Sequence, residues 1–143
     1  MFFLKELPAR AMIENYSRQF KELDVDNVEK TLITLRNASL LLRELEDYFA
    51  QYGLSQLKFL ILIVIDRELE RTSLTSAEIA DRIDVSKPVL SRTINKLLDD
   101  ELLLVKADDC DGRVKHLSLS KQGKKTLNTL LPDYYLLINR FNL

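Results

Sequence analysis

Residues Leu74 to Gly123 read LTSAEIADRIDVSKPVLSRTINKLLDDELLLVKADDCDGRVKHLSLSKQG. The stretch predicts two short capped helices, a strand, a polar turn and a second strand, in that order. No other stretch of the chain suggests any chemistry.

The two helices have separate start signals. Thr75 followed by Glu78 has the spacing of a capping box, in which each side chain binds a backbone N–H of the other residue. Such a box stabilises a helix by roughly 1 kcal/mol. Asp84 and Val85 form the predicted turn between the helices. Ser86 then caps the second helix, with Pro88 tolerated in its first turn.

The second helix has one apolar face and one basic face. Its predicted buried stripe consists of Leu90, Ile94, Leu97 and Leu98. The opposite face is short, polar and basic, and its candidate DNA-binding residues are Ser86, Lys87, Ser91, Arg92, Asn95 and Lys96. Such side chains hydrogen-bond base edges and phosphates in a major groove. A solvated helix face is the alternative interpretation, since most basic surface stripes bind nothing specific.

A predicted hairpin follows the second helix directly. Leu102–Lys106 and Val114–Ser120 are strand-like, and the polar turn DDCDGR separates them. Arg113 is the last residue of this turn and lies two positions after Asp111. The Asp111 carboxylate can orient the Arg113 guanidinium by a charge-assisted hydrogen bond, so that it can enter a DNA minor groove. Lys115 is a further DNA-binding candidate. A surface ion pair worth under about 1 kcal/mol is the other interpretation, but the preceding helices favour DNA binding and complete the outline of a winged helix-turn-helix.

The chain before this region is predicted to be helical. Apolar residues recur at spacings of three and four in Ile13–Leu23 and again in Leu32–Phe49. Gly53 suits the position just after a helix end, and Ser55 can cap the next helix. Leu57–Leu69 is so apolar that we expect a core helix there; a strand is the competing prediction for its central part.

The composition limits the classes of function. The 143 residues are 46% apolar and 30% charged with 3 Gly and 3 Pro, which favours one helix-rich soluble domain. A single cysteine, Cys110, excludes an internal disulfide and a thiol cluster for a metal, so we expect a cytoplasmic protein without cofactors. The apolar run Phe59–Ile65 falls far short of the roughly 20 residues of a membrane span. The one histidine, His116, has no nucleophile partner, and we expect no enzymatic activity.

The net charge of −1 counts against nucleic-acid binding, because domains that bind nucleic acids usually carry a strong positive charge. The distribution of charge weakens this objection. Ser86–Leu98 has three basic residues and Gly112–Lys125 has five, and neither window contains an acid. A winged-helix module that binds another protein is the alternative function. Salt distinguishes the two, because phosphate contacts make DNA affinity strongly salt-dependent.

Three segments between about Leu54 and Gly123 resemble the MarR (multiple antibiotic resistance regulator) family of bacterial transcription factors. LTSAEIADRIDVSKPVLSRTINKLLDDELL is similar to its helix-turn-helix, LSQLKFLIL to the opening of its core helix, and DGRVKHLSLSKQG to its wing signature. The resemblance implies that Lys87, Ser91 and Arg92 face bases and phosphates and that Arg113 reaches the minor groove. It also implies a homodimer on double-stranded DNA, a role as regulator or repressor, and a small effector pocket. A dimer predicts a pseudo-palindromic site with half-sites roughly 10 base pairs apart.

The resemblance predicts three parts: an N-terminal helical dimerisation region at 1–53, a winged helix-turn-helix DNA-binding domain at 54–122, and a C-terminal helix at 123–143 that completes the dimerisation region. The tail after Gly123 is shorter than is typical of the family. We therefore expect the helix at Leu7–Leu23 to substitute for it and to pack with Leu127–Phe141 across a two-fold axis. Glu101 stands where the family usually has glycine, which predicts a differently ended helix or about a kilocalorie of strain.

The candidate effector site is a group of aromatic residues near a predicted helix end. Tyr48, Phe49 and Tyr52, with Arg43 one turn back, could line a pocket for a small aromatic or anionic ligand. Packing in the core explains the same residues equally well. Both interpretations stay open at the level of sequence.

Overall fold

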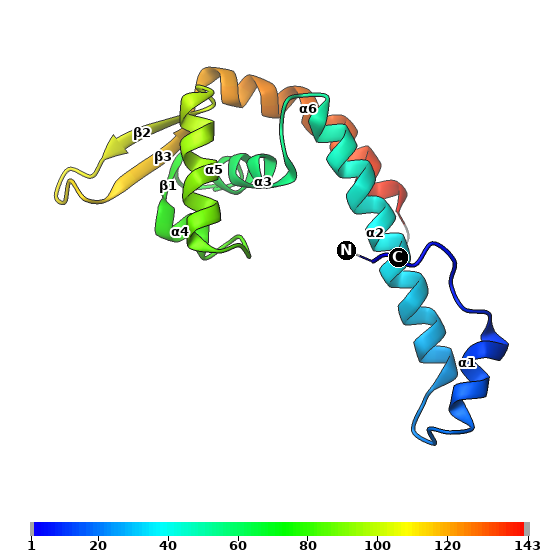
Figure 1. Ribbon diagram of the computed structural model, residues 1–143. Helices are drawn as coiled ribbons and strands as arrows, with labels where there is room; N and C mark the ends of the chain where they lie inside the picture. The colour runs from blue at the N-terminus through cyan, green and yellow to red at the C-terminus, as the bar shows by residue number, and fades with distance from the viewer. Residues whose placement is uncertain (1, 142–143) are drawn as a thin grey trace. The chain divides into compact units, whose positions relative to one another are not determined.

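The computed structural model describes residues 2–141 and is mainly helical, with one small antiparallel sheet. The elements, labelled in Figure 1, are α1 (Arg10–Ser17), α2 (Val25–Ala50), α3 (Gln56–Asp66), β1 (Ser73–Thr75), α4 (Ser76–Ala80), α5 (Lys87–Asp99), β2 (Leu103–Ala107), β3 (Lys115–Leu119) and α6 (Lys121–Arg140). The predicted fold class, a helical protein with a winged helix-turn-helix, is confirmed.

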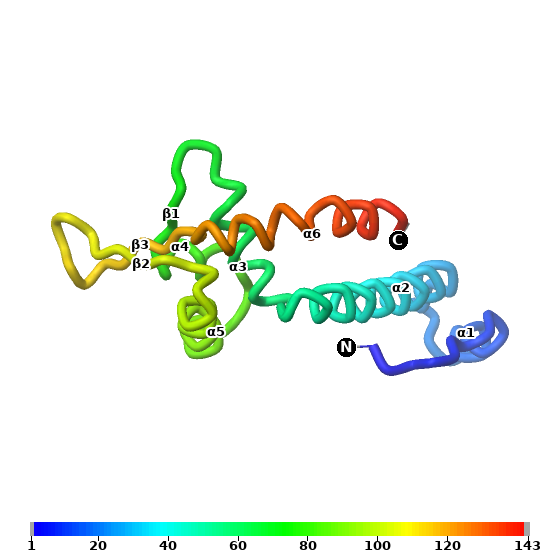
Figure 2. Tube along the Cα trace, turned by 90° about the horizontal axis from the view of Figure 1, so that it is seen from above, coloured from blue at the N-terminus to red at the C-terminus, as the bar shows by residue number. Residues whose placement is uncertain are grey.

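Residue contacts divide the chain into two compact units. The first comprises the described residues up to Leu45 and those from Leu137 onward, and the second is Glu46–Leu136. The second unit holds the three strands together with α3, α4 and α5 (Figure 2). Helix α2 begins in the first unit and ends in the second, and α6 begins in the second and ends in the first. The three parts expected from the sequence stay a prediction.

Helix α3 is the centre of the second unit, where it contacts α4, α5 and β3. Ser55 caps it as predicted, its hydroxyl accepting from the backbone N–H of Lys58 at 3.2 Å. Six of its eleven residues, Phe59 and the run Ile61–Ile65, are at most 9% exposed. A helix that is apolar on all sides is stable only inside a core. The prediction of a helix rather than a strand is thus confirmed, although it ends at Asp66 and not at Leu69.

The sheet contains one strand that the sequence did not predict. Its order is β1-β3-β2, and β1 pairs antiparallel with β3 so that Leu74 lies opposite Leu117. Three residues with one buried side chain are too short to show the alternation by which a strand is recognised. Strands β2 and β3 form the predicted hairpin and start one residue later than expected. In Figure 1 and Figure 2 this hairpin, the wing, extends away from α3, α4 and α5.

Helix α1 is shorter than the predicted helix at Leu7–Leu23, so that prediction is wrong in its extent. It covers only Arg10–Ser17, and Phe20 and Leu23 lie in the following turns. The hydroxyl of Ser17 donates to the carbonyl of Glu14, which is the kind of local bond that competes with helix continuation. The next helix then starts after Asp24, whose carboxylate accepts from the N–H of Asn27 at 3.0 Å.

Candidate nucleic-acid interface

Helix α5 begins at the predicted residue but is capped differently. Ser86 has the extended backbone of an N-cap, with φ −65° and ψ 148°, yet its hydroxyl accepts no bond from the first turn. Pro88 has no N–H to donate, and the first turn contains no acidic residue. The positive end of the helix dipole and an exposed hydroxyl therefore face solvent together, which is an arrangement that attracts phosphate.

The two faces of α5 are as predicted. Leu90, Ile94 and Leu97 are at most 5% exposed and pack inward, while Leu98 is half-buried. The six predicted DNA-binding positions on the other face are all exposed: Ser86, Lys87, Ser91, Arg92, Asn95 and Lys96. Among the residues that the structure describes, the three cations of this face form no ion pair. Their charge is available to an external anion.

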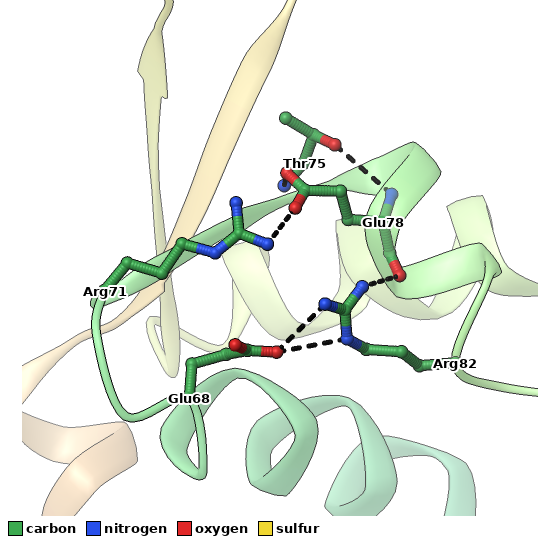
Figure 3. A network of polar contacts seen from close by, with 5 residues as sticks. All are labelled: Glu68, Arg71, Thr75, Glu78 and Arg82. Atoms are coloured by element: carbon green, nitrogen blue, oxygen red, sulfur yellow. Dashed lines mark hydrogen bonds and ion pairs between the residues drawn. The ribbon is translucent and has the colours of Figure 1, made fainter.

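A polar network fixes α4, the helix against which α5 packs (Figure 3). The predicted capping box is present, with Thr75 and Glu78 each accepting from the other's backbone N–H at 3.2 Å. Glu78 also pairs with Arg71, and Arg82 donates to Glu68 at 3.1 Å and to the Glu78 carbonyl at 2.7 Å. Partial burial raises the pKa of the Glu78 carboxyl, but the bonds from Thr75 and Arg71 outweigh it and lower that pKa overall.

The wing presents its arginine to solvent. The Arg113 side chain is 93% exposed, and Asp111 Oδ1 accepts from its backbone N–H at 3.0 Å and from its Nε at 3.2 Å. The contact between these two residues that the sequence predicted is present. Lys115 is exposed as well, and so is Lys106 on the neighbouring strand, a cation that the sequence analysis did not single out.

A left-handed residue joins α5 to the wing. Glu101 has φ 60°, donates its N–H to the Leu98 carbonyl at 3.1 Å, and is followed by Leu102, which donates to the Leu97 carbonyl at 2.9 Å. This pair of bonds is a Schellman motif, which normally ends in glycine. The strained alternative predicted for Glu101 is therefore the one found. Ser120 follows β3, and its hydroxyl donates to the Glu101 carbonyl at 2.6 Å. This bond connects the end of β3 to the segment between α5 and β2.

Comparison with known proteins shows what this arrangement is similar to. A model of the MarR family matches residues 52–114, which cover α3, β1, α4, α5, β2 and the turn of the wing but not β3. The structure also aligns with AbsC, a MarR family transcriptional regulator from Streptomyces coelicolor, with a TM-score of 0.75, over 82% of this chain and 79% of that one at 21% identity. The chain resembles the MarR family.

Two further proteins are similar to the chain. The HTH-type transcriptional repressor YetL of Bacillus subtilis is 29% identical over 133 residues, which are 92% of this chain and 78% of that protein. The M. tuberculosis transcriptional regulator MOSR, whose structure was determined in complex with DNA, is 29% identical over 70% of each chain, with a TM-score of 0.57. Both of these proteins are named as transcriptional regulators, and the chain is similar to them over most of its length.

Three of the four predicted effector residues lie in a packed aromatic cluster of the second unit. Phe49 is 1% exposed and stacks on Phe59 with the ring centroids 4.4 Å apart. The hydroxyl of Tyr48 donates to the Leu130 carbonyl at 2.6 Å, and burial raises its pKa. The ring of Tyr52 meets Tyr48 edge-on at 5.4 Å. The fourth residue, Arg43, is exposed on α2 in the first unit.

A cavity of about 410 Å³ lies between α3 and the turn that precedes α5. Its apolar wall includes Leu57, Leu60 and Val64, and its polar lining includes Arg67 and Asp84. Within the described residues, no group of three His, Cys, Asp or Glu side chains could hold a metal ion. None of the described helices is long and apolar enough to cross a membrane.

Proposed function

We propose that this protein is a MarR-family transcriptional regulator that binds a pseudo-palindromic DNA site as a homodimer and represses transcription there. Helix α5 of each protomer would enter a major groove, and Arg113 of each wing would enter the neighbouring minor groove. One observation carries the proposal: the exposed cations of α5 form no ion pair within the described residues, and the wing arginine is 93% exposed. The name of the YetL repressor supports repression rather than activation.

Exposed apolar side chains of the first unit support the homodimer. Large apolar residues that are 38–60% exposed on α1, α2 and the segment between them are Met12, Tyr16, Phe20, Ile33, Leu35, Leu40 and Leu42. Apolar surface of this extent is typical of an interaction site. A second copy of the chain is the proposed partner, because two-fold dimers are the commonest assemblies and match the symmetry of a palindrome.

The decisive experiment is selection of genomic DNA fragments by the purified protein at 150 mM salt, followed by sequencing. We expect enrichment of an inverted repeat whose half-sites are roughly 10 base pairs apart. Affinity for that site should fall by about 10³ to 10⁵ between 50 and 200 mM salt, if about 6 to 10 phosphates are contacted. A folded dimer that enriches no sequence would instead favour the protein-binding module.

Replacing Arg113 tests the role of the wing. Arg113→Ala should weaken binding to the selected site by about 1–3 kcal/mol, because a guanidinium in the groove is lost. Lys5→Ala is the control, since Lys5 is an exposed cation outside the proposed dimer surface and forms no ion pair among the described residues. Equal affinity of the Arg113→Ala variant and the native protein for the selected site would show that Arg113 does not contribute to DNA binding.

We propose the cavity beside α3 as the place of small-molecule control. Arg67 offers a charge for an anion, Leu60 and Val64 offer an apolar wall for an aromatic body, and Asp84 belongs to the turn that precedes α5. With benzoate as the probe, we expect a rise in melting temperature that Arg67→Ala abolishes and Arg43→Ala does not. Loss of the rise in the Arg43→Ala variant alone would instead support the site predicted from the sequence.

A further inference from the structure

A chain of polar contacts runs through the wing turn from His116 to Arg113. The Nε2 atom of His116 lies 2.8 Å from Asp108 Oδ1. The other oxygen of Asp108 accepts from the backbone N–H groups of Cys110 at 3.0 Å and Asp111 at 3.1 Å. Asp111 in turn accepts from the backbone and from the Nε of Arg113. Two carboxylates therefore connect the imidazole to the exposed guanidinium of Arg113.

We propose that His116 and Asp108 are positioning residues for the wing arginine, and that protonation of His116 strengthens DNA binding by fixing the turn. The proposal rests on the proposed function, in which Arg113 contacts DNA. Neither residue is argued to touch the nucleic acid. Their effect would pass through the conformation of the turn and through Asp111.

The geometry shows why Asp108 matters to the turn. It immediately follows the last residue of β2, and its N–H donates to the Val114 carbonyl at 2.9 Å, so it closes the loop at its base. Its carboxylate holds two amides that would otherwise depend on solvent within a seven-residue connection. The hydrogen bond from His116 is the largest influence on the pKa of Asp108 and lowers it. The ionised carboxylate is the form that holds the turn.

The charges around His116 determine the direction of the effect. Asp108 faces it as an anion, while Lys106 of β2 is its cross-strand partner and opposes a positive charge. On β1 its partner is the uncharged Thr75, and the nearest acid of α4, Glu78, is already bonded to Thr75 and Arg71. A protonated imidazole attracts Asp108 more strongly than a neutral one. Affinity for DNA should therefore decrease as rising pH neutralises His116.

The test measures affinity for the selected DNA site between pH 5.5 and pH 8 at constant salt. We expect the native protein to bind about two- to fivefold more tightly at the low pH. This fold-change corresponds to the interaction energy of an ion pair whose side chains are about one-third exposed, as those of His116 and Asp108 are. His116→Gln keeps a neutral donor and should bind equally at both pH values. Asp108→Asn keeps an acceptor for the two amides and should also lose the pH dependence. Cys110→Ser, the control, should retain it.

Each variant is also combined with Arg113→Ala. If His116 and Asp108 act through the arginine, their replacement should have no further effect on DNA affinity in this background. A pH dependence that persists in the Arg113→Ala protein would mean that His116 contacts DNA itself and would overturn the proposal. So would an unchanged pH dependence in His116→Gln. A normal affinity of Arg113→Ala, by contrast, would refute the proposed role of the wing in DNA binding.

Discussion

Gly123 in the first turn of α6 lies against the backbone of Leu102, so closely that a Cβ atom on the glycine would be 2.1 Å from the Leu102 carbonyl oxygen. The same carbonyl accepts from the N–H of Ser120 at 3.1 Å, and the Ser120 hydroxyl accepts from the N–H of Gly123 at 2.9 Å. The Leu-Ser-x-x-Gly end of the wing signature is thus explained physically. The serine caps α6 and the glycine lets the start of the hairpin pass next to that helix.

Gly123→Ala should destabilise the protein by about 2–4 kcal/mol, because the obstacle is rigid backbone and not a movable side chain. Urea unfolding followed by circular dichroism measures the change. Gln122→Ala is the control, as Gln122 is exposed in the same helical turn, and it should change the free energy of unfolding by less than about 0.5 kcal/mol. Equal stability of the two variants would show that the backbone at Leu102 can move away from the added Cβ atom without a loss in the free energy of unfolding.

Glu101→Gly should stabilise the protein by about 1 kcal/mol, since glycine adopts a φ of 60° without the steric cost that a side chain brings. Thermal unfolding checks this. Glu101→Ala removes the carboxylate but retains the Cβ atom, so it should give no such gain. If both variants were equally stabilised, the gain would come from the loss of negative charge next to Asp100 rather than from the backbone.

Glu78→Gln should lower the stability at pH 7 by about 1 kcal/mol, through loss of the charge that Thr75 and Arg71 stabilise. The folded state lowers the pKa of Glu78, so its contribution is present above the pKa of an unfolded glutamate. This contribution is lost as pH falls through the lower, folded value. Urea unfolding should therefore show a larger difference in the free energy of unfolding between variant and native protein at pH 7 than at pH 3. Glu70→Gln, an exposed control, should match the native protein throughout.

Tyr16→Glu should shift the protein from dimer to monomer at micromolar concentration, because a charge would be buried in the proposed interface. Tyr16 is 57% exposed on α1. Light scattering gives the mass. Leu104→Glu places the same charge on the wing, where the leucine is 56% exposed, and should leave the mass unchanged. A dimer that survives Tyr16→Glu and the removal of residues 1–23 would exclude α1 from the interface.

Much of the DNA-binding unit could be read from the sequence because its signals are local. The capping box of Thr75 and Glu78 involves residues three positions apart, and the Asp111–Arg113 contact involves residues two apart. The exposed face of α5 follows from the helical period alone, since burial of Leu90, Ile94 and Leu97 turns Lys87 and Arg92 outward. Spacing in the chain fixes such relationships before any tertiary contact forms.

The core helix α3, the caps at Ser55 and Thr75, the hairpin and the basic face of α5 were thus predictable from the sequence. Tertiary packing was needed to show that Ser73–Thr75 forms a strand, that Gly123 lies against Leu102, that Phe49 stacks on Phe59, and that His116 meets Asp108. These contacts join different elements or the two ends of the wing turn, and they depend on how those segments dock. No periodicity within one segment encodes that docking, because it is set by the packing of the complete core.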